Sequence, residues 1–371
     1  MADARYVLLI TPDAEAAPTA LFFSRLAWLR PEAVRIARYR RDPAAALLGH
    51  ATAVVFVRGL FEFGDLVRCA SWLGIPRYYF VDDHLILVRE DGGAAAPFVA
   101  DHTEANVVRI LRDFAGVLVS TPALREDFLR RQVHADIRLF PPAMLAVAPA
   151  SARQSRELHV AFFGGAHLHP YLLETIVPAL RRLAQWRPLT FIAAGVPSEV
   201  PPSDGLTIRA LPYEPSYARG LERLRQCGID VLVHPVAPGL RNNPFKNAHA
   251  LITAHALGAI PVVAAAPPYA GLDEAGVAVL CADTPDSWLE GLLRAIDTEQ
   301  VAGLRERLAA YCESEFSGAV NLEVWRDLLA RHSGPGRLTA ALRTMVAATW
   351  IVASLLRRQL AFRRLTTDAE S

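Results

Sequence analysis

The feature that most constrains the fold is an alternation of short apolar runs with helix-length segments, which occurs in two successive sets. Continuous apolar runs are typical of strands buried on both faces, as in parallel sheets covered by helices. The pattern predicts an α/β protein with two parallel sheets. The first set of predicted strands comprises Tyr6–Ile10, Ala53–Val57, Arg77–Val81, Gly116–Val119 and Ile137–Phe140. The second comprises Leu158–Phe163, Leu189–Ala193, Thr207–Ala210, Val231–Val233, Ile260–Ala264 and Val277–Leu280.

A proline-containing stretch of small and polar residues separates the two sets and reads as a linker. We therefore predict an N-terminal Rossmann-like domain over residues 1–147, a linker over 148–157 and a C-terminal Rossmann-like domain over 158–330, followed by a basic and apolar helical tail over 331–371. The length of 371 residues suits two domains. Open α/β sheets bind ligands beyond the carboxyl ends of their strands, so we expect the domains to face each other across a cleft.

Charge and cysteine content narrow the function classes. The net charge of +1 argues against a dedicated nucleic-acid binder. The four cysteines are scattered and form no CxxC pair, which fits neither a disulfide framework nor a zinc site. We expect no signal peptide and no membrane span, because no apolar stretch reaches about 18 residues. These features favour a cytoplasmic protein.

The segment from His234 to Leu272 is the richest in candidate binding residues. A strand is followed by a loop containing Arg241 and Lys246, and then by a predicted helix that begins near Asn247. Free backbone N–H groups at a helix start suit a phosphate, and both basic side chains can add positive charge. Asn247 is the predicted N-cap. An ordinary capped helix with a solvent-exposed arginine is the alternative.

Two further groups stand at predicted strand ends. Gly164 and Gly165 follow a strand and would allow close backbone approach to a phosphate, or simply form a tight turn. Asp82 and Asp83 also follow a strand directly; one could orient an acceptor hydroxyl or act as a base, or both could shape a turn. His167, together with a second histidine two residues later, could contact a phosphate or a sugar.

The order of these motifs resembles the large retaining group of GT-B glycosyltransferases. The resemblance rests on Pro244–Asn247, Ala256–Gly258 and Pro261–Val263, which match the donor-binding pattern of that group, and on RYYFVDDH, GVLVSTPALREDF and FFGGAHLH elsewhere. It spans most of residues 5–315. Two positions depart from the pattern: Thr253 stands where a glutamate usually grips the donor ribose, and Ala250 stands where a second lysine is usual.

The resemblance implies an enzyme that moves a sugar from a nucleotide-sugar donor to a glycan or lipid-linked acceptor, in the assembly of a bacterial surface polysaccharide. No cofactor or metal is expected, since the donor is itself a substrate. It implies donor binding by Gly164, Gly165, Arg241, Lys246, Asn247 and Thr253. It implies catalytic roles for Asp82, Asp83 and His169, the last because it matches a histidine of the glycine turn.

The C-terminal tail is predicted to be helical. Residues 337–365 predict one long helix, apolar in its middle and flanked by arginines. Such a helix could lie on the inner face of the cell membrane, or pack within the protein.

Because of Thr253, a catalytically silent GT-B scaffold in a glycan-assembly complex stays open as an alternative function. A GT-B epimerase also stays open, whereas a dehydrogenase would need GxGxxG after the first strand, where Thr11-Pro12-Asp13 stands instead.

Overall fold

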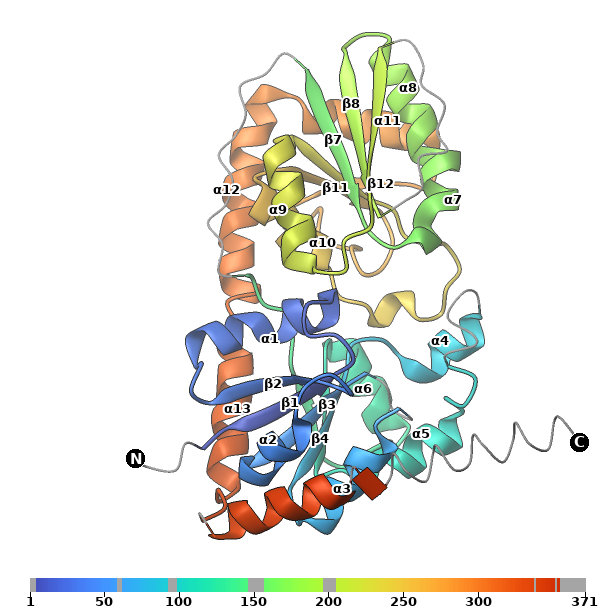
Figure 1. The fold of residues 1–371 in the computed structure, drawn as a ribbon. Helices are drawn as coiled ribbons and strands as arrows, with labels where there is room; N and C mark the ends of the chain where they lie inside the picture. Colours follow the sequence, from blue (N-terminus) through green and yellow to red (C-terminus); the bar gives the residue numbers. More distant parts are fainter. Residues whose placement is uncertain are drawn as a thin grey trace, which may run out of the picture.

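Two six-stranded parallel sheets form the frame of the protein, one in each half of an elongated molecule (Figure 1). The structure, a computed structural model, describes residues 5–58, 62–92, 99–145, 157–195, 205–336, 338–350 and 352–353. The expected pair of Rossmann-like domains is therefore present. Most of the predicted linker falls outside the described residues.

The first sheet has the strand order β2-β1-β3-β4-β5-β6. Its strands are β1 (Val7–Thr11), β2 (Val34–Arg38), β3 (Ala53–Val57), β4 (Arg77–Val81), β5 (Gly116–Val119) and β6 (Ile137–Leu139). Its helices are α1 (Ala17–Leu29), α2 (Ala44–His50), α3 (Gly64–Trp72), α4 (Leu85–Asp91), α5 (Glu104–Leu111) and α6 (Pro122–Arg130). Strand β2 was not predicted: it lies at the edge of the sheet, and its sequence, VRIAR, is interrupted by arginines instead of forming an apolar run.

The second sheet has the order β12-β11-β10-β7-β8-β9. Its strands are β7 (Leu158–Phe163), β8 (Leu189–Ala194), β9 (Leu206–Leu211), β10 (Val231–His234), β11 (Ile260–Ala264) and β12 (Val279–Cys281). The helical segments that follow β7 along the chain are η2 (Ala166–Leu168), α7 (His169–Tyr171), η3 (Leu172–Ile176), α8 (Val177–Ala184), α9 (Tyr217–Cys227), η4 (Asn243–Phe245), α10 (His249–Leu257), α11 (Pro285–Ala295), α12 (Thr298–Glu315) and α13 (Ala319–Arg331). Strands β8 and β9 are added on one side of β7, and β10, β11 and β12 on the other. Doubly wound sheets bind ligands at such a point, where the strand order reverses.

Helix α13 returns the chain to the first sheet, although the sequence placed it in the second domain. The Trp325 indole N–H donates to the carbonyl of Ala33 at 3.1 Å, and the Asn321 amide donates to the carbonyl of Phe22 at 3.2 Å. Both side chains are buried, so α13 belongs by its packing to the N-terminal half.

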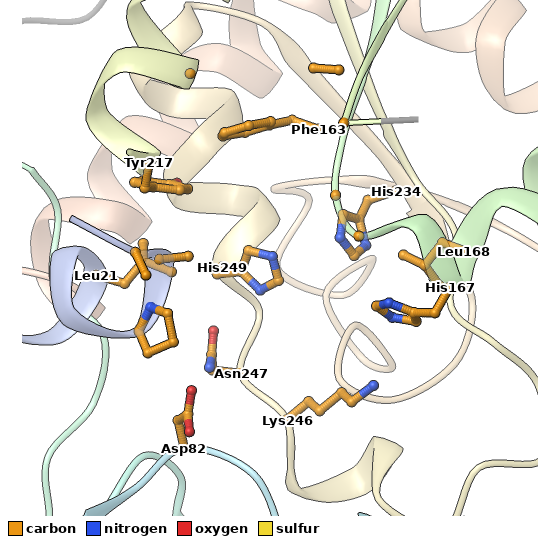
Figure 2. A pocket seen from close by; sticks show the side chains of 18 of the residues that line it. Leu21, Asp82, Phe163, His167, Leu168, Tyr217, His234, Lys246, Asn247 and His249 are labelled. Carbon is orange, nitrogen blue, oxygen red and sulfur yellow. The ribbon is translucent and has the colours of Figure 1, made fainter. Parts of the chain in front are cut away.

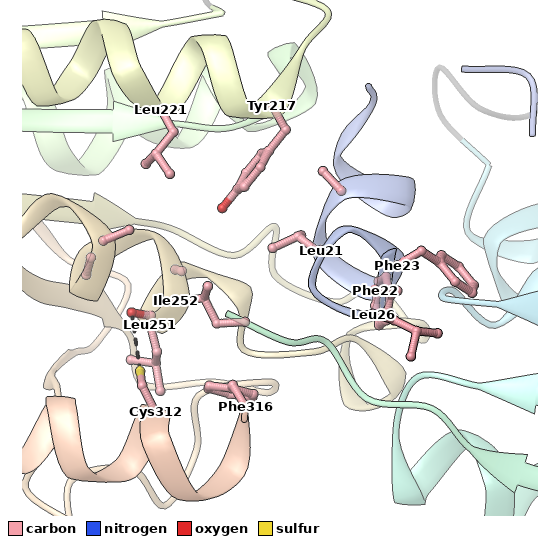
Figure 3. Packing of buried hydrophobic residues seen from close by; sticks show 14 of the residues in the cluster. Leu21, Phe22, Phe23, Leu26, Tyr217, Leu221, Leu251, Ile252, Cys312 and Phe316 are labelled. Atoms are coloured by element: carbon pink, nitrogen blue, oxygen red, sulfur yellow. Dashed lines mark hydrogen bonds between the residues drawn. The ribbon is translucent and has the colours of Figure 1, made fainter. Parts of the chain in front are cut away.

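One apolar cluster crosses the boundary between the two halves. It joins Leu21 of α1, Tyr217 of α9, Ile252 of α10 and Phe316 at the end of α12, as Figure 3 shows. Burial of apolar surface stabilises this junction in proportion to the area removed from water. The two domains are therefore held together by packing as well as by the chain that connects them.

A C-terminal helical segment, residues 338–350, lies against the first domain. Ala340 and Ala347 are buried, and a Cβ added at Gly49 would come within 2.1 Å of the Thr344 hydroxyl oxygen. Within the described ranges, no helix combines the length and the hydropathy needed to cross a bilayer. The predicted continuation of this helix to residue 365 lies largely outside the described residues.

Candidate functional site

A pocket of about 500 Å³ lies between the two domains at the carboxyl ends of both sets of strands. It is lined from the first domain by α1 and the ends of β3 and β4. The second domain contributes the ends of β7, β8, β9 and β10 and the start of α10 (Figure 2). The pocket therefore occupies the cleft that the sequence predicted.

Glycines and the start of α10 form one end of the pocket, here called the phosphate end, with Gly164, Gly165, Lys246 and Asn247 on its wall. A Cβ at Gly164 would lie 2.6 Å from the Phe162 ring, so glycine is needed for this turn. Lys246 has no ion-pair partner within the described part of the chain, and the N-terminal end of the α10 dipole adds positive potential. This end is suited to an anion.

Asn247 lies in the pocket but does not cap α10 as predicted. The helix begins two residues later, at His249, with Ala248 at the N-cap and no side-chain cap. The Asn247 side-chain oxygen is buried and has no hydrogen-bond partner in the described structure. An unpaired buried polar atom is costly, so a ligand that donates a hydrogen bond here would be stabilised.

Three histidines from different elements surround the phosphate end: His167 from η2, His234 from β10 and His249 from α10 (Figure 2). The His234 and His249 rings meet edge to face at 5.1 Å, and Tyr269 Oη lies 3.0 Å from His234 Nδ1. Burial lowers the pKa of all three imidazoles, and the nearby Lys246 charge lowers it further. They are therefore neutral at neutral pH, and each ring can donate one hydrogen bond and accept another.

Asp82 and Asp83 line the part of the pocket that the first domain contributes, here called the carboxylate end. Arg58 follows β3 and pairs with Asp82, with an Nη2–Oδ2 distance of 2.7 Å. Asp83 lies 3.6 Å from the same guanidinium and accepts a 3.0 Å hydrogen bond from Asn242. Burial raises the pKa of Asp82 in spite of Arg58. Such a carboxyl group can orient a hydroxyl or accept its proton.

Three predicted site residues lie outside the pocket lining. Thr253 is buried, and its hydroxyl bonds to Tyr217 Oη at 2.7 Å. His169 stands at the start of α7 while His167 reaches the pocket. Arg241 forms an ion pair with Glu90 of α4 across the domain boundary. A single sequence cannot fix which way a loop arginine points, and here an acidic partner from the other domain decides it.

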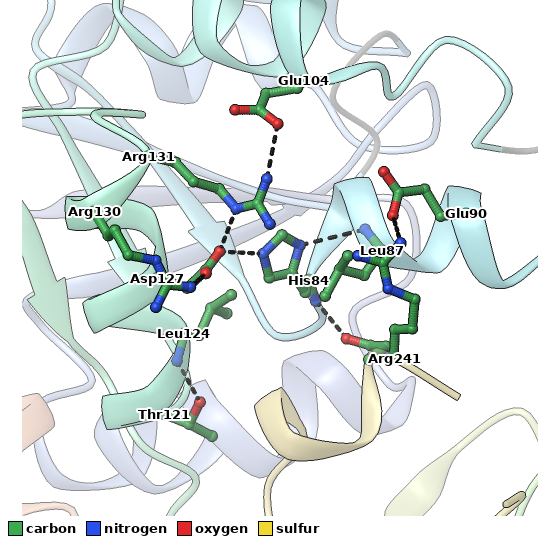
Figure 4. Close-up of polar contacts among 11 residues, drawn as sticks. His84, Leu87, Glu90, Glu104, Thr121, Leu124, Asp127, Arg130, Arg131 and Arg241 are labelled. Atoms are coloured by element: carbon green, nitrogen blue, oxygen red, sulfur yellow. Dashed lines mark hydrogen bonds and ion pairs between the residues drawn. The ribbon is translucent and has the colours of Figure 1, made fainter. Parts of the chain in front are cut away.

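The loop that carries Arg241 fastens the second domain to the first (Figure 4). Asn242 accepts a 2.8 Å hydrogen bond from the backbone N–H of His84, and Thr121 donates a 3.0 Å bond to the carbonyl of Phe245. The buried His84 ring contacts Phe245 with a centroid distance of 4.7 Å and bonds to Asp127 at 2.7 Å. These contacts fix the position of Asp83 relative to Lys246.

A third region of the pocket, here called the nucleoside end, is lined by residues at the carboxyl ends of β8 and β9. The rings of Phe163 and Tyr217 stack at 5.4 Å with an interplanar angle of 25°. Tyr213, whose side chain is 76% exposed, stands at the mouth. The surface here is mainly aromatic and aliphatic, which suits a planar base or a sugar ring.

Sequence reasoning missed several lining residues. Arg58 could have been found, because a charged residue directly after the buried run of β3 mirrors Asp82 after β4. His249 lies in a helix rich in alanine and leucine, and Tyr217 begins another helix, so neither was predicted as a site residue. The fold brings these residues together, and no sequence spacing indicates it.

Comparison with known proteins identifies the architecture. No family model matches the sequence, and no curated protein matches it. Sucrose-phosphate synthase from Thermosynechococcus elongatus superposes with a TM-score of 0.58 at 13% identity, over 88% of this chain and 100% of that chain. WaaG, a glycosyltransferase involved in lipopolysaccharide biosynthesis, superposes with a TM-score of 0.55 at 11% identity, over 87% and 99% of the two chains.

An alpha-glucosyltransferase in complex with UDP-glucose and DNA containing an abasic site gives a TM-score of 0.58 at 8% identity, over 88% of this chain and 99% of that chain. Such low identities establish the fold alone. The chain has the GT-B fold, and the sequence resemblance is confirmed at that level.

Proposed function

We propose that this chain, with its GT-B fold, is a glycosyltransferase that uses a nucleotide-sugar donor. The observation that carries the proposal is the arrangement of the pocket between the domains. An anion site at Lys246 and the start of α10 faces a pair of carboxylates, Asp82 and Asp83, across one cavity. Fold likeness alone would not support a function, because one fold serves many activities.

The phosphate end would hold the donor diphosphate. Lys246, the α10 N-terminus and the backbone at Gly164 and Gly165 would stabilise the negative charge that develops on the leaving diphosphate. Preorganised donors of this kind act most strongly in a site from which water is excluded. The Asn247 side-chain oxygen would accept a hydrogen bond from the transferred sugar.

The carboxylate end would receive the acceptor hydroxyl. Asp83 is held by Asn242 and Asp82 by Arg58, so both carboxylates have fixed orientations. One of them would orient the hydroxyl or take its proton as the new glycosidic bond forms. The acceptor would be a glycan or a lipid-linked glycan. His169 is replaced in this scheme by His167, which lines the pocket.

A peripheral membrane contact belongs to the same proposal. Leu338, Leu342 and Met345 lie on the outer face of the C-terminal helix and are 86%, 58% and 65% exposed. The sequence continues with Arg357, Arg358, Arg363 and Arg364. An exposed apolar stripe that is followed in the sequence by basic residues suits the surface of an anionic membrane.

The membrane contact is testable by flotation with vesicles that contain about a third anionic lipid. We expect the protein to float with the vesicles, and the Leu342→Glu, Met345→Glu double variant to stay behind. Leu129→Glu is a matched control, because Leu129 is an exposed leucine of α6. Equal flotation of all three proteins would count against this contact.

The donor is testable by thermal denaturation in the presence of UDP, GDP, CMP, dTDP and their common sugar conjugates. A ligand that binds the native state raises the melting temperature by mass action. We expect a rise with one nucleotide class, and slow release of the sugar from its conjugate. If no nucleotide shifts the melting temperature, the donor site is wrong.

The catalytically silent scaffold is a second candidate, favoured by the Asp82 carboxylate being already paired with Arg58. A scaffold would bind a nucleotide sugar without turnover. Binding with no hydrolysis and no transfer to any glycan acceptor would select it.

A further inference from the structure

The contacts of His234 indicate which of its ring nitrogens carries the proton. His234 ends β10 at the carboxyl edge of the second sheet, and its buried side chain lines the pocket. Tyr269 lines the same pocket and is fully buried, with its Oη 3.0 Å from His234 Nδ1. Because the imidazole is neutral, one of these two atoms donates a hydrogen bond to the other.

The Tyr269 hydroxyl is the better donor of the two. Burial raises the pKa of Tyr269, so the hydroxyl keeps its proton, although a hydrogen bond from the backbone of Ala250 acts in the opposite direction. Ala250 lies in the first turn of α10, where backbone N–H groups have no partner within the helix. With its oxygen accepting from Ala250, the hydroxyl needs an acceptor for its own proton. Among the described residues, His234 Nδ1 lies within hydrogen-bond distance.

The rival tautomer carries the proton on Nδ1. It could share that proton with the carbonyl of His234 itself, but a hydrogen bond within one residue is bent and therefore weak. It would also leave the buried Tyr269 hydroxyl without an acceptor among the described residues, which is costly. The contacts therefore favour a neutral ring with its proton on Nε2.

The resulting Nε2–H group is left for a ligand of the phosphate end. Nε2 has no hydrogen-bond partner in the part of the chain that the structure describes. Burial lowers the pKa of His234 well below its ordinary value, and the nearby His249, Lys246 and His167 lower that pKa further. All three lie around the His234 ring in Figure 2. The ring therefore borders the anion site at Lys246.

We propose that His234 donates a hydrogen bond from Nε2 to the diphosphate of the donor, and that Tyr269 is a positioning residue that holds the ring in this tautomer. The inference rests on the proposed function. A neutral N–H group with a fixed orientation needs no rearrangement as negative charge develops on the leaving diphosphate. It would complement the positive charge of Lys246.

The tautomer is measured by long-range ¹H–¹⁵N correlation spectra of the full chain labelled with ¹⁵N-histidine. The His234→Asn variant identifies the signals of this ring by their loss. We expect a proton on Nε2 in the unaltered chain and a mixture of tautomers in Tyr269→Phe. A proton on Nδ1 in the unaltered chain would overturn the inference, and an unchanged tautomer in Tyr269→Phe would remove Tyr269 from it.

The ligand contact is measured by isothermal titration calorimetry with inorganic pyrophosphate, which has the diphosphate without a base or a sugar. Asparagine at position 234 keeps a partner for Tyr269 but does not reach the place of Nε2. We expect His234→Asn to weaken binding about tenfold, since hydrogen bonds to charged groups are strong. His234→Gln places an amide N–H near the lost one and should restore most of the affinity. Equal affinity of the unaltered chain and His234→Asn would overturn the inference.

A double-mutant cycle tests the positioning role of Tyr269. Tyr269→Phe should weaken pyrophosphate binding about threefold, and should add nothing in the His234→Asn background, because the hydroxyl acts through the ring. Tyr78→Phe is the matched control: it breaks another buried tyrosine–histidine bond, 2.8 Å from Tyr78 Oη to His332 Nε2, outside the pocket lining. Its affinity should stay unchanged. Additive losses in the cycle would contradict the positioning role.

Failure of this inference is distinguishable from failure of the proposed function. If pyrophosphate binds equally to all folded variants of His234 and Tyr269, the inference is wrong and the proposed glycosyltransferase stands. If neither pyrophosphate nor any nucleotide of the thermal screen binds, both are wrong. If Tyr269→Phe does not fold, the spectrum of the unaltered chain and the two His234 variants still decide.

Discussion

The side-chain amide of Asn242 donates a 3.0 Å hydrogen bond to the carboxylate of Asp83, which lies two residues beyond the end of β4. This bond joins a loop of the second domain to the first domain. The same side chain accepts from the His84 backbone N–H. A buried asparagine with both ends bonded to the other domain defines how the two walls of the pocket face each other.

Replacement of Asn242 by alanine is expected to reduce the free energy of unfolding by about 1–3 kcal/mol, because a buried N–H loses its partner. Arg241→Ala is the neighbouring control. Its side chain is 63% exposed, so loss of its ion pair with Glu90 should cost about 1 kcal/mol or less. Urea denaturation of the two variants measures the difference. An equal loss of unfolding free energy in both would mean that the buried Asn242 amide is not the main stabilising contact between the domains.

Arg241→Ala also tests the corrected position of that side chain. Arg241 is absent from the pocket lining, so nucleotide affinity should be unchanged in this variant. A tenfold loss of affinity would return Arg241 to the donor site, with the Glu90 pair broken on binding.

Replacement of Lys246 by alanine is expected to weaken nucleotide diphosphate binding by about tenfold to a hundredfold, since hydrogen bonds to charged groups contribute about 1.5–3 kcal/mol. Titration calorimetry measures the dissociation constant, and the melting temperature without ligand controls for folding. A dissociation constant that does not change would move the diphosphate away from the α10 start.

His167→Gln and His169→Gln form a matched pair. We expect loss of transfer activity, about tenfold, in the His167 variant alone, because that ring reaches the pocket and the His169 ring does not. The sequence resemblance predicted the opposite. Steady-state kinetics on the donor that the thermal screen identifies will distinguish them.

Acid should destabilise the protein from about pH 6.5 downwards, the ordinary histidine pKa. Burial lowers the pKa of His84 and His234, so the unfolded chain takes up protons before the folded chain does. The stability that the neutral rings contribute is fully present above pH 6.5 and is lost as the pH falls towards their folded pKa. Melting temperatures between pH 5 and pH 8 measure this.

A His234→Gln variant should show a shallower fall in melting temperature over the same range, since one titrating group is gone. His50→Gln is the control, because His50 is exposed at the end of α2. An equally steep fall in the His234 variant would mean that other groups dominate the acid response.

The strands of both sheets were largely predictable because each interior strand is a continuous apolar run, and local hydrophobicity is visible in the sequence. Five of them, β3, β4, β5, β7 and β11, have the predicted bounds. The positions of Asp82 and Gly164 were likewise predictable, since a polar residue or glycine directly after a buried strand must lie at the carboxyl edge of a parallel sheet.

Only the tertiary structure decided which loop side chains reach the pocket. Arg241 turns to Glu90 because an acidic helix of the other domain lies opposite, and Thr253 is covered because Tyr217 of α9 packs on it. Such choices depend on contacts between residues 36 to 151 positions apart, and no local pattern records them. The sequence by itself determined the two sheets and their ligand-binding edges; long-range packing determined the chemistry between them.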